Sequence, residues 1–135
     1  MNLPAQTGIH HLTLTVTDMT CSARWYQDLL GPASVVRREG PGWQRIRMAW
    51  PNGLIIGVTE FEGSDSSDRF DARRVGMDHV GIGCPSREVV LAWAARLDEL
   101  GVEHGPVEEE SYGWAVTARD PDGIAVEFFC LRPAE

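Results

Sequence analysis

Residues 8–12, Gly-Ile-His-His-Leu, decide the fold because they return half a chain length later as Gly-Met-Asp-His-Val at residues 76–80. A second pair of matching stretches keeps nearly the same offset: Trp-Pro-Asn-Gly at 50–53 and Asp-Pro-Asp-Gly at 120–123. Stretches that recur in the same order at one offset are the signature of an internal repeat. The sequence therefore predicts two copies of one small folding unit, each with a histidine at the same place.

The alternation of apolar and polar residues predicts the same order of elements in both copies. Each copy begins with a strand, continues through one helix and ends with three strands. The predicted strands are 9–17, 34–38, 44–50 and 54–59 in the first copy, and 78–84, 102–105, 114–119 and 124–131 in the second. The predicted helices run from Asp18 to Gly31 and from Pro85 to Glu99.

The organisation that follows is one α+β domain over residues 1–135, built from two βαβββ modules. Module one covers about 8–59 and module two about 76–132. The connector at 60–75 is polar and carries the run Gly-Ser-Asp-Ser-Ser-Asp, which is typical of a linker or a lid. Two uses of its residues 69–74 stay open: a lid over the site, or an internally paired surface loop.

Three potential metal ligands share one side of the predicted strands. Because side chains alternate along a strand, His11, His79 and Glu127 point away from the apolar residues that the helices cover. By the same parity, His10 points to the opposite face. Two imidazoles and one carboxylate can hold a divalent metal and leave positions open for a substrate. A carboxylate on an inward face also needs such a partner.

The motifs of the chain resemble the vicinal oxygen chelate superfamily, which includes glyoxalase I, fosfomycin-resistance enzymes, bleomycin-resistance proteins and extradiol dioxygenases. The resemblance is carried in order by residues 8–18, 25–31, 78–80 and 120–127. It implies the glyoxalase/bleomycin-resistance/dioxygenase fold, in which the sheets of two βαβββ modules form a U-shaped cleft around a divalent metal. It also implies a homodimer.

The family's metal positions, transferred residue by residue, fall on His11, His79 and Glu127. The fourth position, a glutamate in glyoxalase I, falls on Gly57, which has no side chain to coordinate. The resemblance thus implies a three-ligand site. Imidazole and carboxylate ligands suit Fe2+, Mn2+, Ni2+, Co2+ and Zn2+, so the sequence does not choose among these metals.

The function that the resemblance implies is a metal-dependent lyase, isomerase or dioxygenase acting on a small molecule that chelates the metal through adjacent oxygens. The alternative is a non-catalytic resistance protein of the bleomycin type, which sequesters an antibiotic or another natural product. At three places the chain differs from the pattern of a family member, which narrows the choice among the family's reactions. Thr117 stands where extradiol dioxygenases carry a tyrosine, and Gly57 replaces the glyoxalase glutamate. Residues 105–113, where fosfomycin-resistance enzymes bind potassium and phosphonate, include a glutamate run at 108–110 that we expect to be solvated.

Residues expected to contact the substrate lie on or near the side of the strands that carries the ligands. They are Thr13, Arg45, Arg47, Thr117 and Trp114. The two arginines can hold a carboxylate through paired hydrogen bonds, and the alternative is a solvated edge strand. Trp114 either caps an aromatic ligand or simply packs. No general base stands out, and the candidates are Glu60, His104 and Tyr112.

Composition excludes several classes of function. The net charge of −8 repels phosphate backbones, so we expect no nucleic-acid partner. All 12 basic residues are arginines, which excludes Schiff-base chemistry on a lysine. No apolar run approaches the ~20 residues of a membrane span, and residues 1–4 lack signal-peptide character, so we expect a cytoplasmic protein without membrane contact. Cys21, Cys84 and Cys130 are expected to be reduced thiols because no closely spaced pair exists.

Overall fold

The chain folds into two compact units that meet in sequence between Ser67 and Asp68, inside the segment predicted as the connector. The structure is a computed structural model and describes residues 2–134. Each unit is a four-stranded sheet with one helix on one of its faces. The fold is therefore α+β with two βαβββ modules, as the sequence predicts.

The first unit has the strand order β1-β4-β3-β2, with β1 parallel to β4 and the other pairs antiparallel. Helix α1 begins after Asp18, whose side chain accepts a hydrogen bond from the Cys21 N–H at 3.0 Å. It ends at Gly31, which takes a φ of 95° that favours glycine. The elements are β1 (Leu12–Thr15), α1 (Met19–Leu30), β2 (Ser34–Gly40), β3 (Trp43–Ala49) and β4 (Ile55–Phe61).

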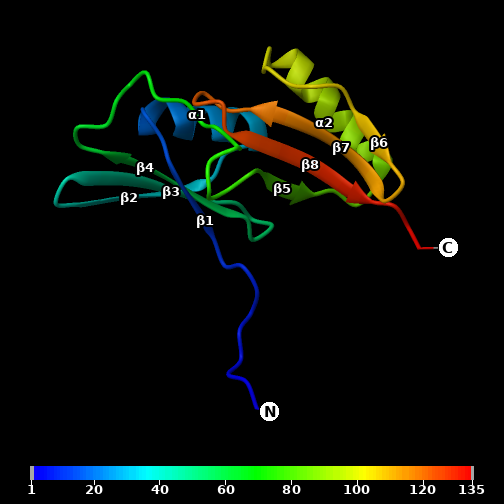
Figure 1. Cartoon of the computed structure of the whole chain (residues 1–135), viewed down its shortest axis with the longest axis horizontal. Helices are drawn as coiled ribbons and strands as arrows, with labels where there is room; N and C mark the ends of the chain where they lie inside the picture. Colours follow the sequence, from blue (N-terminus) through cyan, green and yellow to red (C-terminus); the bar gives the residue numbers. More distant parts are fainter. Residues whose placement is uncertain (1, 135) are drawn as a thin grey trace. The chain divides into compact units, whose positions relative to one another are not determined.

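Helix α1 packs on β3 and β4 and covers one face of the first sheet (Figure 1). The strands bury Leu14, Ile46 and Val58 toward it, and the helix contributes Tyr26 and Leu29. The residues between these apolar positions therefore point to the other face of the sheet, as strand alternation requires.

The second unit repeats this arrangement in the order β5-β8-β7-β6, again with a parallel first pair. Ser86 caps α2 by accepting from the Val89 N–H, and α2 packs on β7 and β8. The ring of Trp93 on α2 stacks on Phe128 of β8 with centroids 4.3 Å apart. The elements are β5 (Val80–Gly83), α2 (Arg87–Glu99), β6 (Glu108–Glu110), β7 (Gly113–Arg119) and β8 (Ala125–Leu131).

The two recurring turn stretches form matching turns. The Gly53 N–H donates to the Trp50 carbonyl at 3.0 Å, and the Gly123 N–H donates to the Asp120 carbonyl at 2.9 Å. Both glycines have positive φ, 94° and 80°, which explains why glycine closes both turns. The predicted repeat is thus confirmed at the level of backbone conformation.

Two predictions about local structure are wrong. Residues 102–105 form no strand, and a single isolated bridge joins His104 to Ala118. The edge strand next to β7 is instead β6, at Glu108–Glu110. Pro106 has no N–H to donate, so it cannot extend a ladder from this position. The three glutamates are exposed as expected, yet they pair with β7. The first strand is also shorter than predicted, because β1 begins at Leu12.

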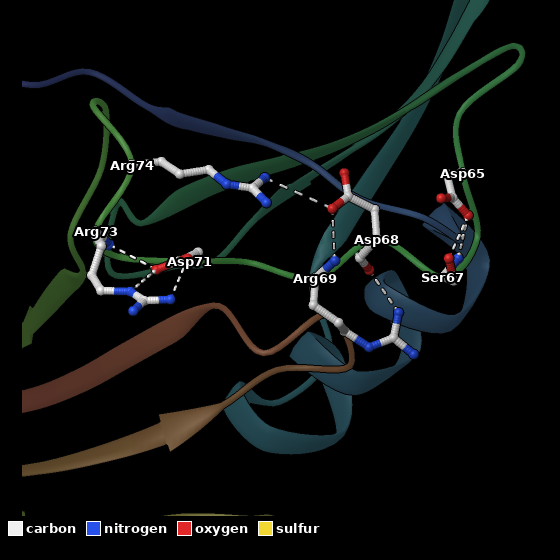
Figure 2. Close-up of polar contacts among 7 residues, drawn as sticks. All are labelled: Asp65, Ser67, Asp68, Arg69, Asp71, Arg73 and Arg74. Atoms are coloured by element: carbon white, nitrogen blue, oxygen red, sulfur yellow. Dashed lines mark hydrogen bonds and ion pairs between the residues drawn. The ribbon is translucent and has the colours of Figure 1, made fainter.

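The polar connector is held by contacts between near neighbours in sequence (Figure 2). In the first unit, Asp65 accepts hydrogen bonds from the N–H and hydroxyl of Ser67. In the second unit, ion pairs join Arg73 to Asp71 at 3.0 Å and Arg74 to Asp68 at 3.8 Å. These pairs match the surface-loop alternative for residues 69–74. No helix within residues 2–134 is long and apolar enough to cross a membrane.

Candidate metal centre

The second unit brings together two of the three predicted ligands, His79 and Glu127. Their atoms His79 Nε2 and Glu127 Oε2 lie 3.8 Å apart, which is too long for a hydrogen bond. Because both ligand types bind metals at roughly 2.1 Å, two such atoms up to about 4.2 Å apart can share one ion. The His79 side chain is about half exposed and that of Glu127 is 22% exposed, so the pair stays accessible.

Asp78 fixes the ring of His79. The His79 Nδ1–H donates to Asp78 Oδ1 at 2.7 Å, since an ionised carboxylate can only accept. In the neutral imidazole this leaves Nε2 with its lone pair, on the side of Glu127. A carboxylate behind a histidine is a common arrangement at metal sites, where it sets the tautomer and the basicity of the ligand. Asp78 is not among the site residues predicted from the sequence, although its place directly before a predicted ligand was a signal.

A pocket of about 300 Å3 opens beside this pair, lined by His79, Glu127, Glu108 and Glu110 together with small and aromatic residues. Among residues 2–134, no arginine lines this pocket. Gly81, beside Glu127 on the neighbouring strand, has no side chain that could cover the carboxylate. An acidic pocket with an imidazole nitrogen fits a divalent cation better than an anion.

The first unit carries His11 at the end of its own sheet, directly before β1. The parity of a regular strand predicts that His10 points to the face opposite His11. This prediction is wrong. The Nδ1 atoms of His10 and His11 lie 2.9 Å apart, so one donates and the other accepts. The contact forms because this stretch precedes the strand, where alternation does not apply. His10 thus occupies the position that Asp78 has in the second unit.

The strand register tests the correspondence between Gly57 and Glu127. In β4, Gly57 lies between Thr13 and Arg47. In β8, Glu127 lies between Gly81 and Thr117. The two positions are therefore equivalent in the two sheets, and the first unit has no carboxylate at this place.

The predicted substrate residues of the first unit share one face of its sheet. Arg45 donates from Nε to Thr59 Oγ1 at 2.8 Å and stacks on the Trp43 ring at 4.7 Å. Arg47 and Thr13 flank Gly57 on the same face. In the second unit, Trp114 borders the acidic pocket, and Arg132 lies 4.4 Å over its ring.

The three candidate bases occupy different surroundings. Glu60 lies on the helix side of β4, where its carboxylate accepts from the Met19 N–H at 3.5 Å. Both ring nitrogens of His104 are engaged at 2.6 Å, by Asp98 Oδ1 and the Gly105 carbonyl. These bonds raise the pKa of His104, the Asp98 bond most. Only Tyr112 borders the pocket that contains His79 and Glu127.

No cluster of three His, Cys, Asp or Glu side chains is already assembled as a metal site within residues 2–134. His79 and Glu127 nevertheless fit a metal by spacing, tautomer and access. They form two-thirds of the predicted ligand set, and His11 lies in the other unit.

Comparisons with known proteins identify the family. The profile of the Glyoxalase/Bleomycin resistance protein/Dioxygenase superfamily matches residues 8–128. A glyoxylase/bleomycin resistance protein/dioxygenase domain from Frankia sp. EAN1pec is 33% identical, with a TM-score of 0.87 over 95% of this chain and all of that one. No curated protein matches the sequence.

Two further solved structures share the fold at lower identity. A glyoxalase family protein from Enterococcus faecalis is 19% identical, with a TM-score of 0.71 over 90% of this chain and 95% of that one. The fosfomycin resistance protein FosX from Listeria monocytogenes, crystallised with Mn(II) and sulfate, is 22% identical, with a TM-score of 0.66 over 93% of each chain. The chain belongs to the Glyoxalase/Bleomycin resistance protein/Dioxygenase superfamily.

Proposed function

We propose that this protein is a metal-dependent enzyme that acts on a small molecule chelating a divalent ion through two adjacent oxygens. His11, His79 and Glu127 are the proposed ligands. The observation that carries the proposal is the 3.8 Å separation of His79 Nε2 and Glu127 Oε2, with the ring of His79 held by Asp78. A carboxylate hydrogen-bonded to the far ring nitrogen of a histidine is a common arrangement at metal sites, which supports His79 as a ligand.

The protein's own groups prepare this site. Asp78 keeps the proton of His79 on Nδ1, and Glu108 and Glu110 add negative charge to the pocket wall. When bound, a divalent ion would supply Lewis-acid stabilisation of negative charge on the substrate oxygens. Tyr112 borders the same pocket and is the proposed proton-transfer residue among the three candidates. We also propose that the protein forms a homodimer.

Mn(II) is the first ion to test, because FosX, which shares the fold, was crystallised with it. Protein purified without chelators should contain about one divalent ion per chain, measured by elemental analysis. His79→Ala should lose most of this metal, whereas His104→Ala, outside the ligand set, should keep it.

The opposite outcome would support the binding-protein alternative. Metal-free wild-type protein that takes up no Mn(II) in calorimetry, yet binds a flat aromatic natural product, would overturn the proposal. Circular dichroism of both variants shows whether a loss of metal reflects a loss of fold.

A further inference from the structure

Three arginines share the face of the first sheet opposite α1. Arg38 and Arg45 are direct cross-strand partners, and Arg47 follows Arg45 by two residues on β3. None of the three forms an ion pair within residues 2–134, although the chain carries 20 acidic residues and 12 arginines. Like charges on neighbouring strands repel, so this grouping costs stability unless an anion binds there.

Arg45 is held in place before any ligand arrives. Its Nε donates to the hydroxyl of Thr59, a residue only 2% exposed, and its guanidinium stacks on Trp43. The Trp43 ring in turn lies across Gly40, where a Cβ would come within 2.6 Å of it. A guanidinium fixed through Nε keeps its two terminal nitrogens as parallel donors and loses little entropy on binding.

Gly57 lets the side chains of Thr13 and Arg45 come close to each other on this face of the sheet. It pairs with Arg47, and an added Cβ would lie 3.6 Å from Arg45 Cδ and 3.2 Å from Thr13 Oγ1. Thr13 follows His11 by two residues, or roughly 7 Å along a strand. A small ligand held by the arginines would therefore lie on the same face of the sheet as Thr13, near the end that carries His11.

We propose that Arg45 and Arg47 form an anion-recognition fork and that the substrate is a 2-hydroxy or 2-oxo carboxylate, in which one carboxylate oxygen is also one of the two vicinal oxygens. A planar carboxylate matches the paired donors of a guanidinium in a bidentate contact. The position of the oxygens relative to a metal rests on the function proposed above. The fork itself is made only of residues of the first unit and needs no metal.

Glycolate and its neutral amide, glycolamide, are matched probes because they differ in charge and hardly in size. Titration into chelator-treated protein, followed by NMR of the arginine Nε–Hε signals, should show glycolate shifting the Arg45 signal and glycolamide leaving it unchanged. Arg45→Gln should weaken glycolate binding about tenfold or more, and Arg45→Lys should weaken it less, since the charge is kept but the fork is lost.

Arg37→Gln is the matched control, because Arg37 is the β2 neighbour of Arg38 and borders the α1 side of the sheet. Equal glycolate affinity in wild type and Arg45→Gln, equal binding of glycolamide, or tighter binding of methylphosphonate than of glycolate would each overturn the fork as a carboxylate site. Mn(II) binding is measured separately. If glycolate still shifts the Arg45 signal but Mn(II) does not bind, the proposed metal enzyme alone is overturned. If Mn(II) binds but glycolate does not shift the Arg45 signal, the carboxylate site alone is overturned.

Discussion

The helix-free faces of the two sheets carry opposite charge on the same backbone pattern. In the first sheet, Arg38 and Arg45 are cross-strand partners. In the second sheet the outer strand β6 carries glutamates, and Glu108 and Glu110 line a pocket with Glu127. The duplication thus kept the strand order and changed the electrostatics. The helix-free face of the second sheet is suited to a cation, and that of the first sheet is suited to an anion.

The two parallel strand pairs, β1–β4 and β5–β8, carry their glycine on opposite strands. In the first sheet, Thr13 lies beside Gly57. In the second, Gly81 lies beside Glu127. Each pair therefore places one glycine next to one larger residue, and the larger residue stands on β1 in the first sheet and on β8 in the second. The position of Glu127 in the second sheet is therefore taken by a glycine, Gly57, in the first.

The largest expected difference between the modules concerns the residue that precedes each histidine. Removing the charge of Asp78 with Asp78→Asn should lower Mn(II) affinity by about 10- to 100-fold, the usual cost of losing a carboxylate behind a metal-bound histidine. His10→Asn, at the matching position, should lower the affinity less than tenfold, because His10 contacts His11 through an imidazole nitrogen and carries no carboxylate. Isothermal titration with Mn(II) measures both.

Equal losses in the two variants would contradict this difference between the modules. No loss in Asp78→Asn would show that the His79–Asp78 bond has no role in metal binding. Glu110→Gln removes a carboxylate from the same pocket without touching a proposed ligand and serves as the control for charge alone.

Most of the fold could be predicted from the sequence, for reasons visible in particular residues. Asp18 and Gly31 mark the ends of α1 through a side-chain cap and a positive φ, both of which are local properties of the residue type. Gly53 and Gly123 mark the two turns in the same way. The repeat also predicts that Gly57 corresponds to Glu127, and the strand register confirms that the two positions are equivalent.

What could not be predicted depends on tertiary pairing. The segment 102–105 is predicted as a strand, but within it only His104 forms a bridge, to Ala118 of β7. Glu108–Glu110 has low strand propensity and becomes β6 because β7 offers it a free edge. Likewise, the contacts of His79 with Asp78 and of Arg45 with Thr59 are side-chain geometry that no periodicity encodes.

A smaller difference is expected when a methyl group is added to each glycine of the two parallel strand pairs. Gly81→Ala should raise the free energy of unfolding by about 0.5 kcal/mol, because a glycine in a strand is entropically costly. The new Cβ would meet Glu127 Oε1 at 3.6 Å, an ordinary contact. Gly57→Ala should lower the free energy of unfolding by about 1 kcal/mol. The added Cβ would crowd Oγ1 and Cγ2 of Thr13, at 3.2 and 3.4 Å. Urea unfolding of both variants gives the comparison, and a Gly57→Ala protein as stable as Gly81→Ala would show that Thr13 yields freely.

The smallest expected difference lies at the ends of the two helices. Helix α1 ends at Gly31, whereas the end of α2 is tied to the following loop by the Asp98–His104 hydrogen bond. This bond raises the folded-state pKa of His104 above the unfolded value of about 6.5. Its contribution to stability is therefore complete below about pH 6.5 and is lost as the pH rises through the folded pKa.

Because the Asp98 side chain is 73% exposed, Asp98→Asn should cost only about 0.5 kcal/mol at pH 5.5, and this cost should vanish at pH 9. Urea unfolding at the two pH values measures it. Glu99→Gln changes the same charge at the last residue of α2, so it controls for the general effect of helix-end charge. A cost that stays constant between the two pH values, or that Glu99→Gln reproduces, would mean that the protonation of His104 does not stabilise the end of α2.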